Sequence, residues 1–89
     1  MQSREILIIN KLGLHARAAA RLVQSASQFD CEINLTFNGK TVNGKSIMGI
    51  MMLAASRGST ITVTATGSDE AQAVDELETL INNRFGEEE

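Results

Sequence analysis

Several residue types are scarce or absent in this chain of 89 residues, and each scarcity excludes a class of protein. A single cysteine, Cys31, excludes an internal disulfide and any metal site built from several cysteines. Tryptophan and tyrosine are absent and phenylalanine occurs three times, so the core must be built from aliphatic side chains. Proline is also absent, which leaves glycine and asparagine to mark the turns.

Positive charge is scarce as well. Eight lysines and arginines stand against eleven aspartates and glutamates, and the net charge at pH 7 is −3. Proteins that bind nucleic acid through bulk charge need clustered basic residues, so we expect no nucleic-acid partner. The longest nearly apolar run, residues 47–55, falls far short of the ~20 residues that span a bilayer, so we expect no membrane insertion. No secretory leader pattern is visible, and the sequence predicts a monomeric cytoplasmic protein.

The length predicts a single domain with one modest core. We place this domain at residues 1–86, because Gly86 is a stop signal for a last helix. The acidic run Glu87, Glu88 and Glu89 is then expected to be a solvated tail.

Apolar residues recur with two different periods along the chain. Short apolar or alternating runs predict strands at 4–9, 32–37, 40–43 and 60–66. Helical spacing predicts helices from Ala16, over 47–53, and from Ser68/Asp69 to Gly86. The order is βαββαβα, which indicates an α+β open-faced sandwich: a four-stranded antiparallel sheet with three helices on one face.

The predicted middle helix, 47–53, has more apolar residues than one buried face can hold, so some of them must be exposed. We expect Ile47, Ile50 and either Met51 or Leu53 to face inward, with Met48 outside. Ser46 precedes this helix, and its hydroxyl is placed to cap it.

His15 is the one histidine, and it lies between Gly13 and the start of the first helix. A helix N-terminus carries unpaired N–H groups and a partial positive charge, which favours a neutral, nucleophilic ring. A phosphoryl group brought to the ring would meet the N–H groups of Ala16, Arg17 and Ala18 and the guanidinium of Arg17. On these residues alone, a solvated histidine–arginine surface pair is the commoner arrangement. No second histidine or cysteine lies at ligand spacing, so we expect no metal.

Two segments carry a family resemblance. Residues 13–19, Gly-Leu-His-Ala-Arg-Ala-Ala, resemble the active-site loop of HPr, the histidine-containing phosphocarrier of the bacterial phosphoenolpyruvate-dependent phosphotransferase system. Residues 44–51, Gly-Lys-Ser-Ile-Met-Gly-Ile-Met, are similar to the regulatory serine region of that family. The resemblance covers nearly all of the chain before the acidic run, with the same order of elements and the same spacing between the segments.

The resemblance implies a role for each matching residue. His15 would take a phosphoryl group on Nδ1 from phospho-enzyme I and pass it to a histidine of an enzyme IIA protein. Arg17 would pair with the phosphoryl oxygens. Ser46 would be phosphorylated by an ATP-dependent HPr kinase, where the cell has one. The protein would then be a stoichiometric carrier without a cofactor, not an enzyme.

A carrier also needs a surface for its partners. An exposed apolar patch beside His15 would serve donor and acceptor alike, because methionine adapts to different surfaces. From periodicity alone, Met48, Met51 and Met52 could equally well be core residues. The family resemblance favours a role in partner docking instead. The candidate partner-binding residues are Ala16, Ala20, Arg21, Lys45, Ile47, Met48 and Met51.

Some positions depart from the family pattern. Ala18 stands where many members have proline, and Leu12 where sugar-system members often have asparagine. Lysines common on the enzyme I surface are missing at Gln24, Ser27 and Gly49. These departures leave open a second reading: a regulatory phosphoprotein of the nitrogen-related branch, whose phosphorylation state is read by partners.

Overall fold

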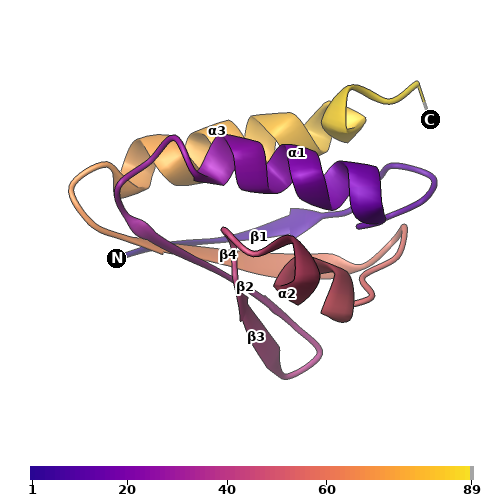
Figure 1. Ribbon diagram of the computed structural model, residues 1–89, viewed down its shortest axis with the longest axis horizontal. Helices are drawn as coiled ribbons and strands as arrows, with labels where there is room; N and C mark the ends of the chain where they lie inside the picture. The colour runs from indigo at the N-terminus through magenta and orange to yellow at the C-terminus, as the bar shows by residue number, and fades with distance from the viewer. Residues whose placement is uncertain (89) are drawn as a thin grey trace.

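The computed structural model describes residues 1–88 and shows one open antiparallel sheet covered by helices (Figure 1). The strands are β1 (Gln2–Leu7), β2 (Glu32–Phe37), β3 (Lys40–Asn43) and β4 (Thr60–Thr66), in the spatial order β1-β4-β2-β3. The helices are α1 (Ala16–Ala26), α2 (Ile47–Met52) and α3 (Glu70–Asn82), followed by a single 3₁₀ turn, η1 (Arg84–Gly86). This arrangement confirms the predicted α+β open-faced sandwich.

The core lies between the sheet and the long helices. Figure 1 shows α1 and α3 side by side across the sheet, while α2 contacts α1 and β3. In β4 the apolar residues Ile61, Val63 and Ala65 are fully buried, and the threonines between them lie on the other face. Each buried leucine, isoleucine or valine side chain contributes roughly 1.5–3 kcal/mol. The alternation in β4 therefore assigns one face of the sheet to the helices and leaves the other open.

The ends of the first strand and the last helix differ from prediction. β1 spans Gln2–Leu7 instead of residues 4–9, because it pairs along β4 until Leu7 meets Thr60, where β4 begins. The last helix ends at Asn82, and the chain then turns through η1 instead of continuing to Gly86.

The middle helix shows a further correction. Ile50 and Leu53 face the core, as predicted, but Ile47 is 42% exposed and does not turn inward. A helix of six residues makes fewer than two turns, so only a narrow stripe can face the sheet. Met48, at 72% exposure, lies outside as expected, and Met51 is exposed as well.

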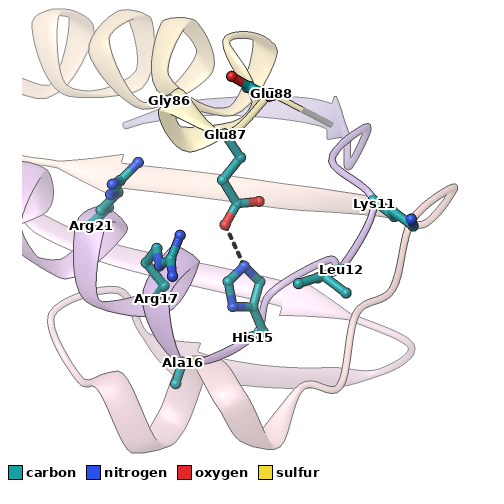
Figure 2. Close-up of a pocket in the computed structure, with 9 residues that line it drawn as sticks. All are labelled: Lys11, Leu12, His15, Ala16, Arg17, Arg21, Gly86, Glu87 and Glu88. Atoms are coloured by element: carbon teal, nitrogen blue, oxygen red, sulfur yellow. Dashed lines mark hydrogen bonds and ion pairs between the residues drawn. The ribbon is translucent and has the colours of Figure 1, made fainter.

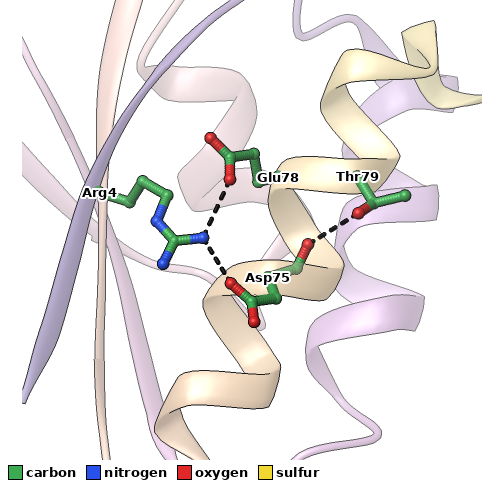
Figure 3. Close-up of polar contacts among 4 residues, drawn as sticks. All are labelled: Arg4, Asp75, Glu78 and Thr79. Atoms are coloured by element: carbon green, nitrogen blue, oxygen red, sulfur yellow. Dashed lines mark hydrogen bonds and ion pairs between the residues drawn. The ribbon is translucent and has the colours of Figure 1, made fainter.

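An ion-pair cluster connects the edge strand β1 to α3. Arg4 Nη1 donates to Asp75 Oδ1 at 2.5 Å and to Glu78 Oε1 at 2.9 Å (Figure 3). The hydroxyl of Thr79 donates to the carbonyl oxygen of Asp75, one helical turn away, at 3.0 Å. Exposed ion pairs add little stability, so this cluster mainly fixes where α3 lies along the edge strand.

The loop before α1 is pressed against the segment that follows α2. Gly13 has φ +66°, and a Cβ there would lie 2.6 Å from the Ala55 carbonyl oxygen and 2.8 Å from Ser56 Cα. The Leu14 N–H donates to the same Ala55 oxygen at 3.0 Å. Only glycine allows this approach, which fixes the backbone two residues before His15.

We therefore expect Gly13→Ala to lower the free energy of unfolding by about 3 kcal/mol or more, from left-handed strain together with a clash against backbone. Gly39→Ala is the matched control, because Gly39 has φ +82° with nothing near the added Cβ. It should lose only about 1–2 kcal/mol. Urea unfolding of both variants measures the difference, and equal losses would contradict the close packing at Gly13.

Candidate functional site

His15 is the N-cap residue of α1. Its backbone is extended, and its carbonyl accepts the Ala19 N–H at 2.8 Å. The imidazole makes no capping hydrogen bond and lies in an open pocket, which Arg17, Arg21 and Glu87 also line (Figure 2). The side chain is 25% exposed, so a group on another protein can reach the ring.

The predicted anion-binding groups gather around this ring. The first turn of α1 leaves the N–H groups of Ala16, Arg17 and Ala18 without an intrahelical acceptor. The Arg17 side chain is exposed and makes no hydrogen bond or close ion pair with residues 1–88, although its charge acts on Glu87. Figure 2 shows its guanidinium beside the imidazole. A free guanidinium and unpaired amides next to a histidine can bind the oxygens of a phosphoryl group.

Glu87 belongs to the same site, and the prediction of a solvated tail is wrong for this residue. Glu87 Oε2 lies 2.5 Å from His15 Nε2, and the Glu87 side chain is only 12% exposed. Glu87 Oε1 accepts a hydrogen bond from Asn10 Nδ2 at 3.1 Å. Asn10 is fully buried and also donates to the Gly13 carbonyl at 2.8 Å. The carboxylate is therefore held from both sides.

Burial opposes ionisation of Glu87, but its surroundings outweigh that effect. The hydrogen bonds from Asn10 and His15, with the positive charge of Arg17 nearby, hold the pKa of the Glu87 carboxyl below its usual value. Glu87 is therefore an anion at neutral pH.

The turn η1 carries Glu87 back over α1. Arg84, Phe85 and Gly86 have positive φ angles of 54°, 56° and 80°. Phe85 is buried in the core, and Arg21 donates a hydrogen bond to its carbonyl oxygen. These two contacts hold a backbone conformation that residues with a side chain rarely adopt.

The predicted partner surface is exposed and apolar. We call the exposed residues of α1 and α2 beside His15 the apolar patch. It consists of Ala16, Ala20, Ile47, Met48 and Met51. Sequence reasoning missed two large exposed neighbours, Leu12 and Met52, although the same excess of apolar residues could have indicated Met52.

The two predicted basic contacts are engaged within the protein. Arg21 is held by the Phe85 carbonyl, and Lys45 Nζ donates to the Phe29 carbonyl at 2.6 Å. Part of the hydrogen-bonding capacity of each side chain is therefore already used within the protein. Among these basic residues, Arg17 is the one whose guanidinium makes no hydrogen bond to residues 1–88.

Ser46 caps α2, as the sequence predicts. Its Oγ accepts the Gly49 N–H at 3.1 Å, and the residue is half-buried next to the exposed face of α2. A charge added at this oxygen would therefore lie beside Met48.

Other candidate chemistry is limited. Burial, together with its contact to Asp69, raises the pKa of the Cys31 thiol, so it is not an activated thiolate. Among residues 1–88, no three histidine, cysteine, aspartate or glutamate side chains cluster in a way that suits a metal ion. The same part of the chain holds no helix with the length and hydropathy needed to cross a membrane.

Known proteins are similar to this chain in both sequence and fold. Residues 2–83 match the family described as PTS HPr component phosphorylation site. Phosphocarrier protein HPr of Cupriavidus necator is 55% identical over 89 residues, which is all of both chains. A crystal structure of HPr-C-His from Thermoanaerobacter tengcongensis has a TM-score of 0.96 at 48% identity, again over both whole chains. An HPr dimer from the same organism has a TM-score of 0.79, with 98% of this chain and 100% of that chain covered.

A match along nearly the whole chain, at about half the residues, agrees with the geometry around His15. The chain therefore belongs to the HPr family, the histidine-containing phosphocarriers of the bacterial phosphoenolpyruvate-dependent phosphotransferase system.

Proposed function

We propose that His15 accepts a phosphoryl group from phospho-enzyme I and passes it to a histidine of an enzyme IIA protein. The observation that carries this proposal is an accessible imidazole at the start of α1 with the exposed guanidinium of Arg17 beside it. The protein acts as a stoichiometric carrier and uses no cofactor, because the phosphoryl group arrives on one protein and leaves on another.

Transfer requires little covalent chemistry from this chain. His15 Nδ1 provides the lone pair that attacks phosphorus. The Arg17 guanidinium and the amides of Ala16, Arg17 and Ala18 bind the phosphoryl oxygens, on which negative charge is spread in the transition state. Return transfer uses the same contacts in reverse, since an enzyme IIA histidine attacks the same phosphorus atom.

We expect His15→Ala to take no phosphoryl group when incubated with phosphoenolpyruvate and enzyme I, while the wild type gains one acid-labile group by intact mass. Arg17→Gln should still be phosphorylated, but about 10²–10³-fold more slowly, the usual effect of losing one transition-state contact. Lys40→Gln is the control for loss of a positive charge, because Lys40 lies at the β2–β3 hairpin, on a different element. A phosphorylated His15→Ala protein would contradict the proposal.

Both partners are proposed to dock on the apolar patch. Large exposed apolar side chains next to a reactive group are typical of interaction sites. Met48 is the most exposed of the large apolar side chains in the patch, and its flexible side chain can fit two different partners.

Met48→Ser should therefore raise the KM for enzyme I about tenfold, in the range of an interface hot spot. Phosphorylation by phosphoramidate, a small donor that needs no docking, should keep its wild-type rate. Leu7→Ser serves as the matched control, because Leu7 is an exposed apolar side chain on β1, away from the patch. An unchanged KM in Met48→Ser would place the docking surface elsewhere.

Ser46 is proposed as the regulatory site, phosphorylated by an HPr kinase where the cell has one. A phosphate there adds a charge of about −1.5 to −2 at a helix N-terminus, which the fold tolerates. The same charge lies beside the apolar patch and would hinder docking of an acidic partner.

Accordingly, Ser46→Asp should slow phosphorylation by enzyme I while changing the free energy of unfolding by less than about 0.5 kcal/mol, because aspartate also caps helices well. Ser68→Asp adds the same charge near the start of α3 and should transfer at the wild-type rate. Equal transfer rates in Ser46→Asp and wild type would remove the regulatory role.

Pathway, oligomeric state and location complete the proposal. The identity of the enzyme IIA that accepts the phosphoryl group distinguishes a role in sugar uptake from a role in the nitrogen-related branch. The rate of phosphotransfer to each purified enzyme IIA identifies that acceptor. We propose a cytoplasmic monomer, although crystal structures of similar proteins from T. tengcongensis and Bacillus subtilis show dimers.

A further inference from the structure

We propose that Glu87 is a positioning residue for His15: its carboxylate holds the ring through Nε2 and stabilises the positive charge that the ring acquires on phosphorylation. This inference rests on the function proposed above and adds a residue from the far end of the chain. The geometry that carries it is the 2.5 Å contact between Glu87 Oε2 and His15 Nε2.

The contact determines which ring nitrogen is free. A carboxylate has no proton to donate, so the ring nitrogen that touches Glu87 must carry one. In the neutral ring the other nitrogen, Nδ1, then has the lone pair. Figure 2 shows this second nitrogen on the side of the ring that faces Arg17, away from Glu87. The nucleophilic atom is thus directed toward the group that binds the phosphoryl oxygens.

The transfer step creates a positive charge on the ring. The Nδ1 lone pair forms the new N–P bond, the bond between phosphorus and the donor's leaving atom breaks, and that electron pair leaves with the donor. The ring keeps its proton on Nε2 and becomes a phosphorylated imidazolium. A carboxylate in contact with Nε2–H stabilises this cation, in the same way that aspartate supports histidine in a catalytic triad.

The other charges of the pocket make this support necessary. Arg17 and Arg21 also line it, and their positive charges oppose an imidazolium. Glu88 lines the pocket as well, but Figure 2 shows its carboxylate pointing away from the ring. Glu87 is the anion in contact with His15 among residues 1–88.

The chain also holds Glu87 in place. Asn10 donates to its second oxygen, and the strained turn before it is fixed by buried Phe85 and by Arg21. Backbone strain of this kind persists where the surrounding structure determines the conformation. The carboxylate is therefore preorganised, so no ordering is required when the ring reacts.

The test compares Glu87→Ala and Glu87→Gln with Glu5→Gln, a control that removes a negative charge on β1, outside the pocket. Phosphoramidate serves as donor without a partner protein, and intact mass gives the rate of His15 phosphorylation. We expect Glu87→Ala to be slower by about 10- to 100-fold, by analogy with the loss seen when the carboxylate partner of a metal-bound histidine is removed. Glu87→Gln keeps an acceptor without charge and should recover part of this loss. Glu5→Gln should match the wild type.

Nitrogen NMR of the ring supplies a readout that a purely structural role would not change. The wild type and Glu87→Gln should show a hydrogen-bonded Nε2–H, and Glu87→Ala should lose that signal while keeping its backbone spectrum. A Glu87→Ala protein with wild-type rate and an unchanged ring signal would overturn the inference. A wild type that takes no phosphoryl group on His15 would instead overturn the proposed function, so the two failures are distinguishable.

Discussion

The close approach of Gly13 to the backbone of Ala55 and Ser56 is the contact on which the site depends. It fixes the loop between β1 and α1 against the segment that follows α2. The start of α1 and the exposed face of α2 are therefore held in a fixed relative position. The reactive ring and the apolar patch sit on those two elements. This backbone contact therefore helps to fix the position of His15 relative to the apolar patch.

Helices and strands could be predicted from the sequence where one face is buried, because apolar residues then recur at regular spacing. In β4 the alternation of Ile61, Val63 and Ala65 with threonine reflects one buried and one open face, and the structure confirms it. The ends of strands could not be predicted in the same way, because they depend on the neighbouring strand. β1, for example, ends where Leu7 pairs with the first residue of β4. The prediction that Ile47 faces inward was wrong, because helical spacing does not show how narrow the buried stripe of a short helix is.

The candidate site was predictable only in its local part. His15 and Arg17 lie two residues apart in a recognisable segment, and Ser46 precedes a helix that it caps. Glu87 lies 72 residues from His15 in the sequence, so no spacing connects them. The turn that brings it back has positive φ at Arg84, a residue type that gives no turn signal, so a solvated tail was the natural expectation.

Under the proposed function, the apolar patch beside the His15 pocket also constrains the order of events. In a carrier built this way, donor and acceptor must occupy the same surface, so they exclude each other and no ternary complex forms. The reaction then follows ping-pong kinetics, in which an excess of either unphosphorylated partner acts as a competitive inhibitor of the other. The ratio of partners in the cell, and not only their affinities, then determines how fast phosphoryl groups flow through His15.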